Sequence, residues 1–188
     1  CALTLIALCA CLRSGANPIE TVISDLVDSG KVLGAQALLG ENDQILIEQY
    51  IGVRSAVDPT PIDSTTQFCI GSCSKPFASA TLVALAQQGL LQLETPISEI
   101  RHEFQKPKLT DNGKSTKDPN ILELLSHRGG IYSQKRGMNG RQARWIRDFQ
   151  LPLADAVSGI AKEKLIFEPG TDYAYSGAGY CVLGRVAE

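Results

Sequence analysis

The chain has 188 residues, with 18 lysine and arginine residues against 20 aspartate and glutamate residues, for a formal net charge of −2. This balance gives no electrostatic reason to bind nucleic acid or an anionic membrane surface, so nucleic acid is excluded as a partner. Hydrophobic residues make up 44% of the chain and charged residues 20%, a composition that allows a packed core and argues against wholesale disorder.

The first sixteen residues resemble an export leader. Residues 2–12 are an uninterrupted apolar run, too short to span a bilayer but as long as a signal-peptide core. Residues 8–11 also resemble a bacterial lipobox, in which Cys11 would carry the lipid; the simpler alternative is the start of a strand or helix. We therefore predict a remnant of a signal peptide or lipoprotein leader in residues 1–16 and an exported, periplasmic or cell-envelope protein, tethered to the membrane if Cys11 is lipidated.

A helix followed by a hairpin is predicted next. Asn17 and Pro18 are typical of a helix start, apolar residues then fall on one face, and Gly30 ends the helix. Two apolar, β-rich runs, 32–39 and 45–53, surround the turn residues 40–43 and predict an antiparallel hairpin.

The residues from 74 to 91 predict a helix that belongs inside the protein, because they are almost all small or apolar. Cys69 and Cys73 flank Ser72 just before it, and we expect them to be small buried residues and not nucleophiles. The cysteines (1, 9, 11, 69, 73 and 181) form no metal pattern and His102 and His127 suggest no zinc site, so no metal or cofactor is expected.

The remainder predicts short helices and long polar loops. We expect a turn-rich insertion at 109–120, helices at 119–126 and 153–161, a turn at 168–171 and a glycine-rich helix start after 176. The basic stretch 134–145 is interpreted as a solvated surface, with a specific anion site as the alternative. The last residues keep helical spacing, so we interpret the chain as a fragment open at both ends.

Ser72 and Lys75 form the most informative pair. Three residues apart at the start of a helix, they share one face, so the lysine can reach the serine oxygen and take or relay its proton. The helix N-terminus adds backbone N–H groups beside a developing oxyanion. The alternative is an N-cap serine followed by a surface lysine. A second unit holds Tyr175, which is either a core aromatic or a base activated by the Lys75 cation, since a phenol has an ordinary pKa of about 10.

Three ordered blocks resemble the serine β-lactamase-like family, which includes class C β-lactamases, D-Ala-D-Ala carboxypeptidases and related esterases. The blocks are Gly71-Ser72-x-x-Lys75-Pro76-Phe77, Leu124-Leu125-Ser126-His127-x-Gly129-Gly130-Ile131 and Pro169-Gly170-x-x-x-x-Tyr175-Ser176-Gly177-x-Gly179-Tyr180-x-x-Leu183-Gly184. The resemblance implies Ser72 as nucleophile, Lys75 as its proton partner and Tyr175 as general base. It also implies an oxyanion hole that uses the Ser72 N–H, and a structural role for the second block, so His127 is interpreted as a loop residue.

One departure from the family concerns substrate binding. Class C β-lactamases have Asn two residues after the tyrosine, where this chain has Gly177, so the amide that would contact a substrate carbonyl is absent. Related peptidases and esterases have Tyr-Ser-Gly at this position. We therefore still expect a hydrolase, but Gly177 argues against β-lactamase activity. The family's third motif, a Lys or His before Gly that would bind the substrate carboxylate, would fall after Glu188. The sequence therefore says little about which substrate is bound.

The resemblance implies an α/β (α+β) fold, an antiparallel sheet flanked by helices plus an all-helical subdomain. Residues 17–188 would be its N-terminal part, lacking the later strands and inactive by itself. The predicted function is a serine hydrolase that forms an acyl-enzyme from an amide or ester: a cell-wall peptide, a β-lactam or a small ester. Two alternatives are a penicillin-binding or sensing module that acylates with little turnover, and a degenerate, non-catalytic domain.

Overall fold

The computed structural model describes residues 18–105, 107–136 and 138–188. The predicted leader, with Cys1, Cys9 and Cys11, lies outside the described residues, so export and lipidation stay predictions. The chain divides into two compact units, one up to Cys69 and one from Ile70 onward. Among the described residues, no helix has both the length and the apolar character needed to cross a membrane.

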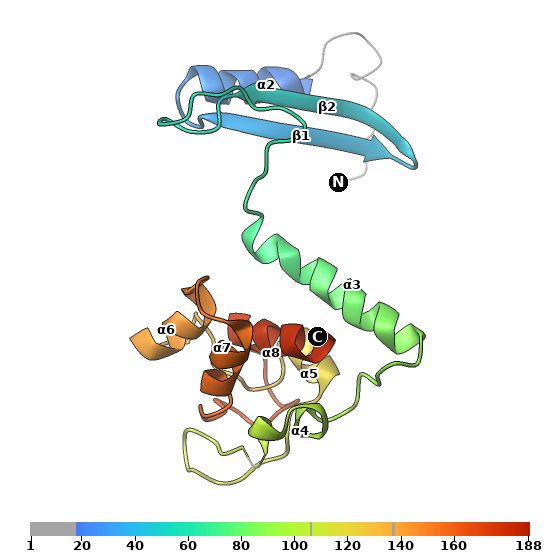
Figure 1. The fold of residues 1–188 in the computed structure, drawn as a ribbon, viewed down its shortest axis with the longest axis vertical. Helices are drawn as coiled ribbons and strands as arrows, with labels where there is room; N and C mark the ends of the chain where they lie inside the picture. The colour runs from blue at the N-terminus through green and yellow to red at the C-terminus, as the bar shows by residue number, and fades with distance from the viewer. Residues whose placement is uncertain (1–17, 106, 137) are drawn as a thin grey trace. The chain divides into compact units, whose positions relative to one another are not determined.

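The N-terminal unit contains one helix and one hairpin. Helix α2 (Pro18–Asp28) packs against the antiparallel strands β1 (Gly34–Glu41) and β2 (Gln44–Gly52), as Figure 1 shows. Asn42 in the connecting turn has φ 53°, a left-handed conformation that asparagine tolerates better than most residues. The predicted helix and hairpin are both present, with strand ends shifted by one or two residues.

The C-terminal unit is built from helices, as predicted for the helical subdomain. Its elements in chain order are η1 (Gly71–Cys73), α3 (Ser74–Gln87), α4 (Ile97–Ile100), η2 (His102–Phe104), α5 (Ile121–Leu125), α6 (Gly140–Arg147), α7 (Leu153–Ile160) and α8 (Gly177–Ala187). The basic stretch interpreted as a solvated surface contains the start of α6. Asn139 caps this helix, and Gln142 completes the capping box.

Helix α8 lies at the centre of the packed core of this unit, in contact with α3, α5, α6 and α7. Its buried face places Ala178, Val182 and Leu183 against the other core side chains. These are Leu82, Ile97, Phe104, Ile121, Leu124, Ile131, Tyr132, Val157, Ile160 and Leu165.

Replacing Leu183 with alanine should therefore lower the free energy of unfolding by about 2–5 kcal/mol, through lost burial plus a cavity. Leu183 is 0% exposed, whereas Leu122 on α5 is 45% exposed. The matched Leu122→Ala change should cost much less, roughly 1 kcal/mol or below. Urea unfolding of the full-length protein measures both, and equal losses would contradict this description of the core.

The prediction that α3 is buried on most sides is wrong for the described residues. Only Leu82 of this helix is buried, and Phe77 is 69% exposed. One side of the helix packs against α8, where the hydroxyl groups of Ser79 and Tyr180 form a hydrogen bond of 2.9 Å. An apolar composition alone therefore did not indicate which of its sides are covered.

The cysteines beside Ser72 are also not buried as expected. Cys69 and Cys73 are exposed, and Cys181 on α8 is partly buried; all three are free thiols. The first two precede and follow Ser72 closely in the sequence. Burial in the core of the unit raises the pKa of the Cys181 thiol, which keeps it protonated.

Candidate active site

Ser72 and Lys75 are held together by the local geometry of the α3 start. Gly71 has φ 53°, a conformation that glycine adopts freely, and it turns the chain into the short helix η1. Ser72 lies in η1 and Lys75 in the first turn of α3, so their side chains share one side. The Lys75 Nζ donates to Ser72 Oγ at 3.1 Å. Ser72 is exposed and thus open to a substrate.

Tyr175 comes from the segment before α8 and lies beside this pair. The Lys75 Nζ is 5.0 Å from the centre of the Tyr175 ring and 5.4 Å from that of Tyr180. Interaction with the Lys75 ammonium, and next with the Ser72 hydroxyl, lowers the pKa of the Tyr175 phenol from its ordinary value. The structure thus brings together all three residues that the sequence singled out as catalytic candidates.

Hydrogen bonds fix the backbone around Tyr175. Its carbonyl accepts from Ser133 Oγ at 2.6 Å. The preceding N–H, of Ala174, donates to the His127 carbonyl at 3.0 Å, and the following N–H, of Ser176, donates to His127 Nδ1 at 3.1 Å. Ser176 also caps α8, because its Oγ accepts from Gly179 N at 3.0 Å.

His127 is the residue that the sequence analysis did not place in the site. It lies in the loop after α5, as expected, but its φ is 59°, which is uncommon for a residue with a side chain. Its ring centre lies 4.5 Å from that of Tyr175 and 5.1 Å from that of Tyr180. The only sequence signal was its position inside the second block, which carries no indication of this contact.

Gln134 occupies the space that a side chain at position 177 would need. The Gly177 N–H donates to Gln134 Oε1 at 3.1 Å, and a Cβ built on Gly177 would lie 2.4 Å from Gln134 Nε2. In sequence, this chain has Gly177 where class C β-lactamases have an asparagine. The structure shows the Gln134 carboxamide, from a different loop, in the space that a side chain at position 177 would enter.

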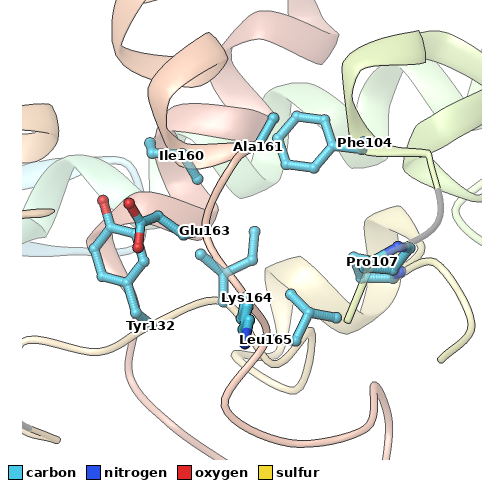
Figure 2. Close-up of a pocket in the computed structure, with 10 residues that line it drawn as sticks. Phe104, Pro107, Tyr132, Ile160, Ala161, Glu163, Lys164 and Leu165 are labelled. Carbon is cyan, nitrogen blue, oxygen red and sulfur yellow. The ribbon is translucent and has the colours of Figure 1, made fainter. Parts of the chain in front are cut away.

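Other parts of the C-terminal unit offer weaker candidates. A small cavity of about 10 Å³ lies between α7, η2 and the loops that carry Tyr132 and Leu165 (Figure 2). It has room for about one water molecule and is lined by none of the three candidate residues. Within the described ranges, no group of histidine, cysteine and acidic residues could hold a metal ion.

Comparisons with known proteins identify the family and similar proteins. Residues 19–188 match the family model described as Beta-lactamase. The chain is 26% identical over 170 residues to Protein flp of Staphylococcus aureus and 27% identical over 181 residues to Esterase EstB of Burkholderia gladioli. In structure it is similar to EstCE1, a hydrolase with promiscuous acyltransferase activity, with a TM-score of 0.79 and 26% identity over 95% of this chain.

The chain covers only part of each of these proteins. The alignments include 90% of this chain but 32% of flp, and 92% of this chain but 45% of EstB. The structural match spans 48% of EstCE1.

Proposed function

The chain belongs to the β-lactamase family, and from this premise we propose that it forms part of a serine hydrolase in which Ser72 is acylated by an ester or amide substrate. The observation that carries the proposal is the 3.1 Å contact between Lys75 Nζ and Ser72 Oγ, with the Tyr175 ring beside the lysine. A structural serine and a surface lysine would not need a tyrosine of lowered pKa next to them.

The proposed first step is acylation. Tyr175, as phenolate stabilised by the Lys75 ammonium, accepts the Ser72 hydroxyl proton while Oγ forms a bond to the substrate carbonyl carbon. The tetrahedral intermediate then collapses: the bond to the leaving alcohol or amine breaks, and the leaving group takes the proton back from Tyr175. The product is an ester between Ser72 and the acyl group.

Deacylation reverses the same proton transfers. A water molecule gives a proton to Tyr175, attacks the acyl carbon and expels Ser72 Oγ, which regains its proton. The negative charge on the carbonyl oxygen in both steps would be stabilised by the Ser72 N–H and the positive N-terminal end of α3.

Esters are the substrates to test first, because EstB is an esterase and EstCE1 a hydrolase with promiscuous acyltransferase activity. The full-length gene product should be assayed with p-nitrophenyl butyrate, a chromogenic cephalosporin and a peptide that ends in D-Ala-D-Ala. Turnover of the ester supports the proposal. Acylation by the cephalosporin without release would favour a sensing module, and no reaction with any of the three would contradict a hydrolase.

We propose that the side-chain amide of Gln134 donates a hydrogen bond to a carbonyl group of the substrate, as the asparagine of class C β-lactamases would. Replacing Gln134 with alanine should lower kcat/KM about tenfold, which corresponds to one lost hydrogen bond. Gln150→Ala, at an exposed glutamine of the same unit, serves as the control and should leave kcat/KM unchanged. A Gln134→Ala protein that folds normally and keeps the wild-type kcat/KM would exclude this role.

A further inference from the structure

His127 contacts the Tyr175 segment through both its backbone and its side chain. Its carbonyl oxygen accepts from the Ala174 N–H and its Nδ1 accepts from the Ser176 N–H, so the N–H groups of the residues before and after Tyr175 are bound to one residue. Two such hydrogen bonds to a single residue restrict rotation of the segment about its own axis. The direction of the Tyr175 side chain is thereby linked to the position of His127.

Aromatic contacts fix the imidazole ring itself. It lies tilted at 41° over the rings of both Tyr175 and Tyr180, and Tyr173 meets it edge-on with ring centres 6.0 Å apart. Aromatic pairs at these separations and angles are attractive. The left-handed backbone of His127 is uncommon, and strained backbone of this kind is found most often at functional sites.

The hydrogen bond from Ser176 also determines the protonation state of the ring. A nitrogen that accepts a hydrogen bond carries no proton, so His127 must be neutral, with its proton on Nε2. The groups that face the ring are the Lys75 ammonium from α3, the Tyr180 phenol from α8 and the phenols of Tyr173 and Tyr175. Burial, and next the Lys75 charge, lower the pKa of His127, which agrees with this assignment.

We infer that neutral His127 is a positioning residue for the proposed reaction: it holds Tyr175 beside Lys75 and Ser72, and protonation of its Nδ1 releases the tyrosine. The inference rests on the proposed function. A protonated Nδ1 would direct an N–H at the Ser176 N–H, so two donors would face each other. It would also place a second cation near Lys75.

The dependence on pH follows from the direction of the shift. Because the pKa of His127 is lowered in the folded protein, its neutral form is favoured by folding. This contribution to stability is complete above the ordinary histidine pKa of about 6.5 and is lost as the pH falls from there through the lowered value. Protonation of Tyr175 alone already lowers the rate of Ser72 acylation as the pH falls. Below the lowered pKa of His127 the rate should fall more steeply than Tyr175 accounts for, and this additional loss is the acidic decrease attributed to His127.

The test measures the rate constant for labelling of Ser72 by a fluorophosphonate in the full-length protein, from pH 5 to 9. His127→Phe keeps an aromatic ring but removes the acceptor, and should lower the rate constant at pH 7.5 at least about tenfold. His127→Asn offers a side-chain carbonyl as acceptor and tolerates left-handed backbone. It should recover most of the rate lost in His127→Phe. Because asparagine does not titrate, it should lack the additional acidic decrease due to His127 and keep only the pH dependence set by Tyr175.

The second histidine provides the matched control. His102→Asn changes an exposed histidine of η2 and should keep both the rate constant and the acidic decrease of the wild type. A folded His127→Phe protein with the wild-type rate constant would overturn the inference. If His127→Phe does not fold, the His127→Asn profile decides: an unchanged acidic decrease overturns the inference, and its disappearance supports it. Labelling that persists in Ser72→Ala would instead refute the proposed function.

Discussion

Replacing Ser72 with alanine in the full-length protein should lower kcat for ester hydrolysis by about 10⁴-fold or more, because the change removes the hydroxyl that forms the acyl-enzyme. Substrate binding should change little, since the removed atom is one hydroxyl oxygen on an exposed side chain. The fold should also be preserved, because Ser72 is exposed and its Oγ interacts with the side chains of Lys75 and Tyr175, outside the packed core.

The matched control for this variant is Ser74→Ala. Ser74 is an exposed serine two residues further on, at the start of α3, and it has no part in the proposed mechanism. Steady-state kinetics and a melting temperature for both variants separate loss of the nucleophile from disturbance of the helix start. Ester hydrolysis by Ser72→Ala at more than a few per cent of the wild-type rate would exclude Ser72 as nucleophile.

Replacing Tyr175 with phenylalanine should lower kcat by about 10²–10⁴-fold, the range that a general base contributes. The ring that packs on His127 is kept, so the change removes only the phenolic oxygen. In the wild type, the rate should rise with pH until the Tyr175 phenol is deprotonated, at a pKa below its ordinary value of about 10. The variant should lack this rise.

Tyr173→Phe is the corresponding control. Tyr173 lies two residues earlier on the same segment, is 56% exposed and meets the His127 ring edge-on. Removal of its hydroxyl should leave kcat and the pH profile unchanged. If Tyr175→Phe retained the wild-type kcat and pH profile, Tyr175 would not be the base, and Lys75 alone would have to take the proton.

Much of the site could be predicted because it depends on local spacing. Ser72 and Lys75 meet because three residues in a helical turn place two side chains on one side, and sequence alone contains that information. The hairpin and helix α7 were predicted for the same reason, since alternation and helical periodicity are local patterns. Tyr175 could be identified only through the resemblance of its block to a family.

The remaining features depend on contacts between distant segments. His127 and Tyr175 are separated by 48 positions, and Gln134 and Gly177 by 43, so no periodicity links them. The exposure of Phe77 shows a related limit: composition indicated an apolar helix but not which of its sides other elements would cover.

The most direct test of the account is the intact mass of the full-length protein, followed over time after addition of a fluorophosphonate and, separately, of a fluorescent penicillin. Wild type should gain the mass of one fluorophosphonate adduct and Ser72→Ala should gain none. With penicillin, an adduct that depends on Ser72 and then decays would show complete acyl-enzyme turnover. The absence of any adduct on wild type with either reagent would contradict the claim that Ser72 is an acylated nucleophile.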